Sequence, residues 1–338
     1  MNYPESLKIG DTIGICAPSA GIVKPEKLIK LDCAIKALNE MGYKVIETAS
    51  VRKDVNGRSA SAKERADEFM SLLENEEVKM IIFATGGDFL CEILDHLDFE
   101  KIKTLKPKWM QGYSDITGIS YLFNVNLDIP SLYSQTIKDY AMKPLHRNLI
   151  DSLRIASGEE ITQSSFDYYE KEWNESEDPY AGYNLTEKVE WKNVLGPNRV
   201  EIEGRSIGGC LDCIKSYIGT KYDKVTDYIE RHKDDGIIWF LEAFEMNTAE
   251  LQRTLWQMKS AGYFKYCKGI LFGRPLFIRE DYETSFNEAV KISLEDLNIP
   301  VICDVDIGHV SPQIATVNGA ILKITSENGK GEVETYLR

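Results

Sequence analysis

The sequence has no apolar run of the kind that crosses a bilayer. No stretch of about 18 consecutive apolar residues occurs in its 338 residues. Its first residues, MNYPESLKIGDTIG, also have no basic segment followed by an apolar core, which a secretory signal would require. The sequence therefore predicts that the chain has no membrane span and no secretory signal. We therefore expect a cytoplasmic protein that has no membrane partner.

Positive charge is also scarce. The chain has 40 Lys and Arg against 54 Asp and Glu, which gives a formal net charge of −14. Proteins that bind nucleic acids rely on Lys and Arg to neutralise phosphates. The balance therefore argues against a nucleic-acid partner, and small molecules or peptides are the ligands that the composition favours.

Cysteines are few and scattered. The seven cysteines lie mostly within apolar stretches, which is typical of buried thiols in a reducing compartment rather than of a disulfide framework. Cys210 and Cys213 form one C-x-x-C pair, a spacing that redox and zinc sites also use. Because no second pair stands at ligand spacing, we interpret these two cysteines as one buried helix face. The sequence predicts no metal site.

The N-terminal part of the chain alternates strand patterns with helix patterns. Strands are expected at 11–17, 44–48, 79–84 and 109–113, and helices at 25–41, 61–73, 89–97 and 116–123. This alternation predicts an α/β fold with a parallel sheet covered on both faces and with ligands at the carboxyl ends of its strands. TGGD at 85–88 and GYSD at 112–115 both lie at such ends.

The length of the chain predicts two domains. We expect an N-terminal α/β domain at 1–162, an aromatic-rich connecting loop at 163–198 and a smaller C-terminal α/β domain at 199–338. The loop is expected because 163–197 is rich in Tyr, Trp, Glu and Asp without a clean period. The last domain has strand patterns at 236–241 and 269–272, and helix patterns at 249–258 and 284–294.

Ser114 stands where a strand pattern gives way to a helix pattern. A serine there could be a nucleophile whose hydroxyl is presented at the edge of the sheet, with the amide of Asp115 directed into the same space. Taken alone, the position favours a helix N-cap, because Ser is preferred there. GYSDI also lacks the second glycine of the G-x-S-x-G nucleophile elbow, which argues against an ordinary α/β-hydrolase.

Two further residues could complete a serine site. Glu242 ends the apolar strand pattern IIWFLE, so its carboxylate must be exposed, paired or functional. His309 is one of only four histidines and follows a strand pattern in the turn-like DIGHVSP. The other three histidines stand in patterns of solvated surface. His309 is therefore the best candidate for a general base.

Five segments in this order resemble the LD-carboxypeptidase family of serine peptidases: TGGD at 85–88, GYSDIT at 112–117, EGRSIGG at 203–209, FLE at 240–242 and GHVSP at 308–312. The resemblance covers nearly the whole chain. It implies a triad in which Ser114 is the nucleophile, His309 the general base and acid, and Glu242 the orienting carboxylate. It also implies an oxyanion hole formed by the main-chain amides of Gly87 and Asp115.

The resemblance carries further expectations about fold and assembly. It implies a flavodoxin-like N-terminal domain, a smaller C-terminal α/β domain and a homodimer. The reaction that it implies is acyl transfer to water, which needs no metal or organic cofactor.

The family has two branches with different substrates. One trims the terminal D-alanine from murein tetrapeptides, and the other, the microcin C self-immunity branch, cuts the amide between an aspartyl residue and a nucleotide-like group. The aromatic stretch at 166–191 resembles the second branch. Trp173 and Trp191 are candidates for stacking on a nucleobase, although simple packing would also account for them. Arg205, within EGRSIGG, is a further candidate for substrate binding.

Two segments depart from the family pattern. The chain has Leu132-Tyr133-Ser134-Gln135 where the family usually has a Tyr-Gly-Pro or His-Gly-Pro turn, and Gly208-Gly209-Cys210 where it usually has Gly-Gly-Asn. These changes leave the triad candidates in place but leave the choice of substrate open. A catalytically silent protein that binds a peptide or nucleotide is one alternative to a hydrolase, and a redox or metal enzyme that uses the cysteines is another.

Overall fold

The chain folds into two compact units. The computed structural model describes residues 1–172 and 176–338. The N-terminal unit comprises Met1–Phe123, Leu127–Glu159 and a short stretch that ends at Gly182. The C-terminal unit comprises Asn124–Asn126, the chain that begins at Glu160, and Tyr183–Arg338. The sequence predicted a C-terminal domain smaller than the N-terminal one. The C-terminal unit is not smaller, because it includes much of the segment that was expected to be a connecting loop.

The N-terminal unit is built on a parallel sheet. Within this unit the strand order is β5-β4-β3-β1-β2, and each neighbouring pair is parallel. The strands span Thr12–Cys16 (β1), Lys44–Glu47 (β2), Val78–Phe83 (β3), Trp109–Gly112 (β4) and Ser131–Tyr133 (β5). This is the strand order of flavodoxin-like sheets, whose ligands gather at the carboxyl ends of the strands. The predicted flavodoxin-like α/β fold is confirmed.

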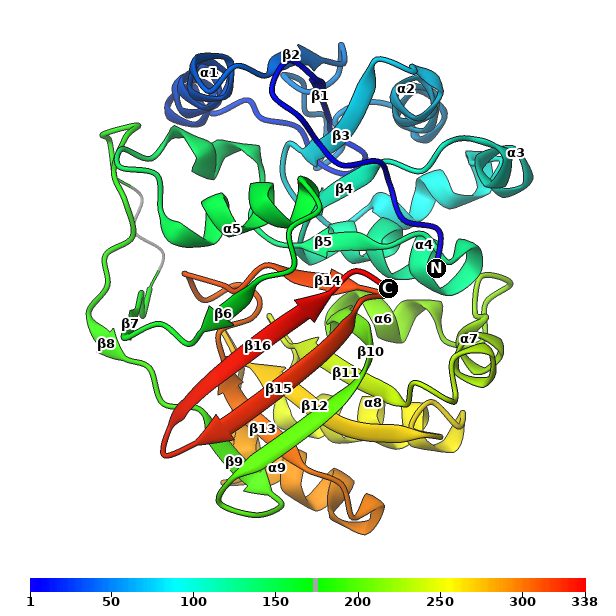
Figure 1. Ribbon diagram of the computed structural model, residues 1–338, viewed down its shortest axis with the longest axis vertical. Coiled ribbons are helices and arrows are strands. Elements are labelled where there is room, and N and C mark those ends of the chain that lie inside the picture. The colour runs from blue at the N-terminus through cyan, green and yellow to red at the C-terminus, as the bar shows by residue number, and fades with distance from the viewer. Residues whose placement is uncertain (173–175) are drawn as a thin grey trace. The chain divides into compact units, whose positions relative to one another are not determined.

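Helices lie on both sides of this sheet. Figure 1 shows α1 (Pro25–Glu40) and α5 (Arg147–Ala156) on one side of β1 and β3, and α2 (Ala62–Glu74) and α3 (Phe99–Thr104) on the other. The sequence sets where α2 begins, because Ser61 and Glu64 form a reciprocal capping box. The helix expected at 89–97 is a 3₁₀ helix, Leu90–His96.

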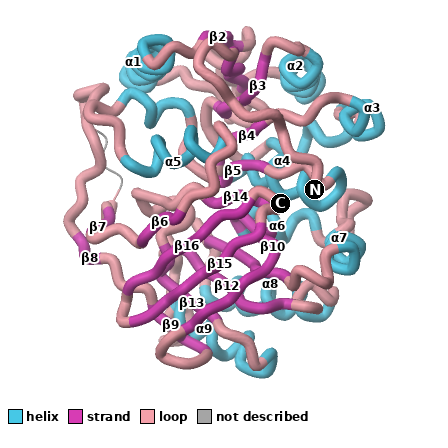
Figure 2. Tube along the Cα trace, in the orientation of Figure 1, coloured by secondary structure: helices cyan, strands magenta, loops and turns pink. Residues whose placement is uncertain are grey.

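The C-terminal unit contains a mixed sheet with the order β6-β16-β15-β10-β11-β12-β13-β9. Its strands span Thr162–Ser164 (β6), Lys192–Leu195 (β9), Val200–Cys210 (β10), Ile237–Glu242 (β11), Cys267–Gly273 (β12), Val301–Val305 (β13), Ile321–Glu327 (β15) and Lys330–Tyr336 (β16). Figure 2 shows the long strands β10, β15 and β16 of this sheet. The four central strands, β10 to β13, are parallel. The segments after these strands therefore leave from one edge of the sheet.

Helices and short strands complete the C-terminal unit. The helices are α6 (Leu211–Tyr217), α7 (Val225–Arg231), α8 (Thr248–Ser260) and α9 (Phe286–Leu294). The predicted connecting loop is not all loop, because β6 and β9 are edge strands of the sheet and β7 (Tyr168–Tyr169) pairs with β8 (Glu187–Lys188). Short edge strands pair through their backbone, which leaves little periodic signal in their side chains.

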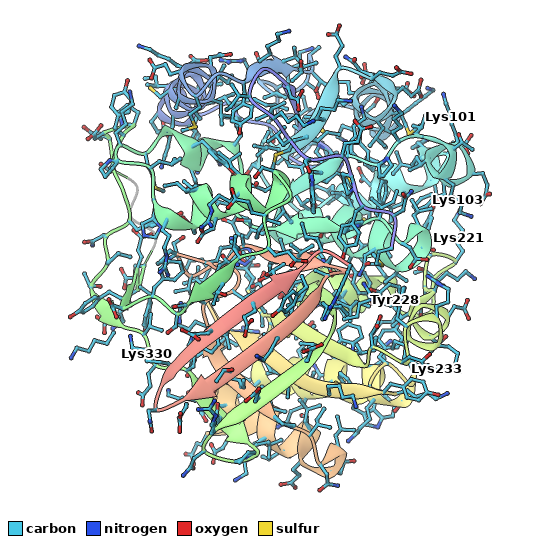
Figure 3. All side chains as sticks on the ribbon, viewed as in Figure 1. Lys101, Lys103, Lys221, Tyr228, Lys233 and Lys330 are labelled. Atoms are coloured by element: carbon cyan, nitrogen blue, oxygen red, sulfur yellow. The ribbon has the colours of Figure 1, made fainter. Side chains whose placement is uncertain are left out.

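Surface lysines have acidic partners close by. Lys101 and Lys103, which point outward from α3 in Figure 3, pair with Glu74 and Glu100 at 2.6 Å each. Lys233, also labelled there, pairs with Glu230 at 3.0 Å. The positive charge of these lysines is therefore neutralised locally, in keeping with the net negative charge of the chain. Among the described residues, no helix has the length and apolar character needed to span a membrane.

Candidate active site

Ser114 lies on a tight turn between β4 and α4 (Thr117–Leu127). Its backbone is left-handed, with φ at 65°, a conformation that is uncommon for a residue with a side chain. An N-cap has an extended backbone, so the helix-cap alternative does not describe Ser114. A strained residue between a strand and a helix is the geometry that exposes a nucleophile at the carboxyl edge of a sheet.

The loop that contains Gly86 and Gly87 packs directly against Ser114. A Cβ placed on Gly86 would lie 2.9 Å from the Ser114 Cβ and 3.0 Å from its Oγ, so only glycine fits there. Gly87 has φ at +148° and would place a Cβ 2.4 Å from the Oγ of Ser19. The amide of Ser114 donates to the hydroxyl of Tyr133 at 3.2 Å. The loop of Gly86 thus packs against the Ser114 side chain without room for a further Cβ.

The carboxylate of Asp115 connects three loops of the N-terminal unit. It accepts a short hydrogen bond from the Ser19 hydroxyl and another, at 2.9 Å, from the amide of Leu90, and the residue is only 5% exposed. These partners follow β1 and β3, whereas Asp115 follows β4. Its side chain therefore fixes the turn, while its amide is the part that we expected at an oxyanion hole. The sequence patterns did not single out Ser19.

Glu242 and His309 lie together in the C-terminal unit. Nδ1 of His309 is 2.9 Å from Oε2 of Glu242, and the two side chains are 3% and 0% exposed. A carboxylate can only accept, so Nδ1 carries the proton and donates it. The sequence required Glu242 to be exposed, paired or functional, and the structure shows that it is paired.

Glycines and an aromatic ring enclose this pair. Gly308 has φ at +94°, and a Cβ on it would lie 2.6 Å from the Cγ of Glu242. A Cβ on Gly273, at the end of β12, would lie 3.1 Å from the Glu242 Cβ. The ring of Phe244 stacks on the imidazole, with centroids 4.1 Å apart and planes tilted by 20°. Glu242 and His309 are thus packed in one arrangement.

Asp306 secures the start of the loop that carries His309. It is fully buried and bonds the guanidinium of Arg274. It also accepts from the indole Nε1 of Trp191 at 3.0 Å and from the amide of Phe166 at 3.1 Å. The sequence offered only one signal for this role, the acid that precedes IGH at the end of a strand pattern.

Cys210 borders the Glu242–His309 pair. It is the last residue of β10 and lies beside Glu242 in the strand register, so the interpretation of Cys210 and Cys213 as one helix face is wrong. Only Cys213 lies within α6. The pKa of the Cys210 thiol is raised well above its ordinary value, mainly by a hydrogen bond with Cys213 and secondly by burial. The Cys210 thiol is therefore protonated at neutral pH.

The three candidates for substrate binding have different outcomes. Trp191 is only 2% exposed, so packing accounts for this indole and stacking on a nucleobase does not. Trp173 lies outside the described residues. Arg205 is paired with Asp235 at 2.7 Å and also donates to the carbonyl of Arg338 at 3.0 Å. These contacts give Arg205 a structural role that requires no substrate.

The remaining candidates are divided between the two units. Ser114, Gly87 and Asp115 belong to the N-terminal unit, whereas Glu242 and His309 belong to the C-terminal unit.

Comparison with known proteins identifies both halves of the chain. The model of the LD-carboxypeptidase N-terminal domain matches residues 13–134, and that of the LD-carboxypeptidase C-terminal domain matches residues 203–324. The chain is similar to a probable murein peptide carboxypeptidase of Bacillus subtilis, with 26% identity over 95% of this chain and 91% of the relative. It is equally similar, at 26% identity, to the microcin C7 self-immunity protein MccF of Escherichia coli, over 98% of this chain and 95% of the relative.

Solved structures show the same fold. MccF in complex with glutamyl sulfamoyl guanosine superposes with a TM-score of 0.81 at 22% identity and covers 99% of both chains. A muramoyltetrapeptide carboxypeptidase from Oxalobacter formigenes superposes with a TM-score of 0.73 at 23% identity, over 96% of this chain and 98% of that one.

Proposed function

This chain belongs to the LD-carboxypeptidase family of serine peptidases, and on that premise we propose that it hydrolyses an amide through a triad of Ser114, His309 and Glu242. The observation that carries the proposal is the buried hydrogen bond of 2.9 Å between His309 and Glu242. A carboxylate that holds Nδ1 leaves Nε2 as the ring nitrogen that takes up the serine proton. The left-handed turn at Ser114 gives independent support.

The mechanism is acyl transfer to water. His309 removes the proton of Ser114 as its Oγ attacks the amide carbonyl, and the imidazolium then protonates the departing amine. The amides of Gly87 and Asp115 stabilise the negative oxygen of the tetrahedral intermediate. Water then repeats the cycle on the acyl-enzyme. General-base assistance contributes about 10² to 10⁴ in rate, and one oxyanion donor contributes roughly 10² to 10³.

The substrate that we propose first is an aminoacyl group joined by an amide to a nucleotide-like moiety. Support comes from the 26% identity to MccF and from the aromatic character of the connecting segment, where Tyr168 is 43% exposed. The second candidate is a murein tetrapeptide, favoured by the equal identity to the murein peptide carboxypeptidase. We further propose a homodimer, as the resemblance implies.

A paired hydrolysis assay tests the proposal. Aspartyl sulfamoyl adenosine, the ligand of another MccF structure, and a murein LD-tetrapeptide are each incubated with the wild type and with Ser114→Ala. The matched control is Ser120→Ala, which alters a buried serine on α4 whose hydroxyl has no hydrogen-bond partner within the described chain. We expect one substrate to be cut by the wild type and the control, and by Ser114→Ala at a rate at least about 10³-fold lower.

The assay distinguishes the alternatives. The substrate that is cut selects the branch. Full activity in Ser114→Ala would remove Ser114 from the mechanism. If neither substrate is cut by the wild type but either binds in calorimetry, the protein is a binding protein that retains the fold or an enzyme that acts on another substrate.

A further inference from the structure

A cysteine, a glutamate and a histidine converge in the C-terminal unit. One possible ligand atom from each of Cys210, Glu242 and His309 lies within 4.8 Å of the other two. All three side chains are buried, at 2%, 0% and 3% exposure. They come from the carboxyl edge of the parallel strands, namely from the end of β10, the end of β11 and the loop after β13. The mechanism proposed above uses two of them and leaves the thiol of Cys210 without a role.

The chemistry of this group is that of a zinc ligand set. Zn²⁺ prefers cysteine sulfur, histidine nitrogen and carboxylate oxygen, at about 2.3, 2.0 and 2.1 Å respectively. Tetrahedral coordination at those lengths puts sulfur and nitrogen about 3.5 Å apart, and all ligand atoms of the cluster lie within 4.8 Å of one another, so the contraction needed is at most about 1.3 Å. The glutamate oxygen and the histidine Nδ1 already lie 2.9 Å apart and hardly need to move.

We propose that Cys210, Glu242 and His309 form a binding site for a thiophilic divalent cation such as Zn²⁺, and that the bound ion switches off the proposed hydrolase. Asp212 is a fourth polar group at this place. Its carboxylate is 3.6 Å from the Cys210 sulfur and accepts from the amide of Phe244 at 2.9 Å. A water or this carboxylate could complete the coordination.

The inhibition follows from the proton count, and this part alone rests on the proposed function. Zn²⁺ displaces one proton, from the Cys210 thiol, into solution. At His309 the ion takes the place of the proton on Nδ1, and that proton moves to Nε2, so the imidazole stays neutral. A protonated Nε2 cannot accept the proton of Ser114.

Direct metal binding is the decisive experiment. The wild-type chain, made metal-free with a chelator, is dialysed for a long period against ZnCl₂, because ligands this deeply buried load slowly. Bound zinc is counted by mass spectrometry. Co²⁺ is loaded in parallel, since its thiolate charge-transfer absorption reports a Co–S bond. Cys210→Ala is compared with Cys303→Ala, which removes a buried cysteine of β13 that is not in the cluster.

We expect one zinc per chain and a Co²⁺–thiolate band in the wild type and in Cys303→Ala. Cys210→Ala should lose the band and bind zinc at least about 10- to 100-fold more weakly, since even loss of an outer-shell partner costs that much. If Cys210→Ala does not fold by circular dichroism, Glu242→Gln carries the same test. Less than one zinc in the wild type, or wild-type binding by Cys210→Ala, would overturn the proposal.

The test also separates this site from the proposed function. Ser114→Ala should bind zinc as the wild type does, because Ser114 is not a ligand. Zinc bound at Cys210 in a chain that cuts neither substrate would support the site and leave the hydrolase without support. Hydrolysis by a chain that takes up no zinc would support the hydrolase and overturn the zinc site.

Discussion

Gly308 offers a sharp test of how the structure holds Glu242 against His309. In Gly308→Ala the new Cβ would lie 2.6 to 2.8 Å from three carbons of Glu242, which is closer than real Cβ contacts allow. The neighbouring Gly273 would place its own Cβ 3.1 Å from the Glu242 Cβ. The glutamate is thus confined on two sides, and we expect it to move away from His309.

A matched control isolates this clash from the cost of the backbone conformation. Gly219, in the same unit, has φ at +80°, and no heavy atom of the described chain lies within 4 Å of a Cβ placed on it. Both substitutions put alanine into a left-handed backbone, which costs about 1–2 kcal/mol. Only Gly308→Ala adds overpacking, worth about 1–3 kcal/mol more. The expected loss of unfolding free energy is therefore about 1–2 kcal/mol for Gly219→Ala and about 2–5 kcal/mol for Gly308→Ala.

Urea unfolding and hydrolysis together measure the effect. We expect the same urea dependence in both variants with different midpoints. We also expect kcat for the substrate that is cut to fall about 10²- to 10⁴-fold in Gly308→Ala, because the general base loses its orientation. Gly219→Ala should keep the wild-type kcat. Equal stability of the two variants, with full activity in Gly308→Ala, would refute the claim that Gly308 confines Glu242.

Three further predictions concern charge and protonation. Asp306→Ala should lower the free energy of unfolding by about 3–5 kcal/mol, because it removes the carboxylate that pairs with a buried guanidinium. In the same urea titration Asp296→Ala, which breaks an exposed pair with a lysine, should lower it by no more than about 1 kcal/mol. Equal losses in the two variants would contradict the reasoning. Iodoacetamide at pH 8 should label the exposed Cys91 before the buried Cys210, because the pKa of the Cys210 thiol is the more strongly raised. Peptide mass mapping follows the order of labelling, and early labelling of Cys210 would contradict this prediction. Burial lowers the pKa of Lys108 to about 8, so between pH 8 and about 10.4 the unfolded chain binds more protons than the folded chain. The unfolding free energy of the wild type, measured relative to that of Lys108→Met, should therefore rise with pH over this range. A constant difference in unfolding free energy between the two proteins would exclude this effect.

The sequence alone was sufficient for several elements of the N-terminal unit, but β5, α3 and α5 were not predicted. The strand patterns around 11–17 and 79–84 correspond to β1 and β3, because strands buried on both faces need continuous apolar runs. The helix patterns at 25–41 and 61–73 likewise correspond to α1 and α2. The edge strands in 163–198 were missed, since their pairing is made by the backbone.

The residue types of the candidate site were also readable from the sequence. Ser114 follows a strand of the N-terminal sheet, whereas Glu242 ends and His309 follows a strand of the C-terminal sheet. Each therefore lies at a carboxyl edge, where the ligands of parallel sheets gather. Motif order along the chain then indicated the family. The residue signals are local, because each depends only on neighbours within a few residues, whereas the family resemblance draws on motifs spread along most of the chain.

Only the tertiary structure decided which groups touch. Three contacts join segments that are far apart in the chain. Nδ1 of His309 bonds Glu242, the indole of Trp191 bonds Asp306, and Cys210 lies beside the Glu242–His309 pair instead of on a helix face. Such contacts are set by strand register and by the space that glycines such as Gly308 leave open. A pattern of hydrophobicity specifies which face of a strand is buried, but the partner that meets that face is fixed only when the whole unit packs.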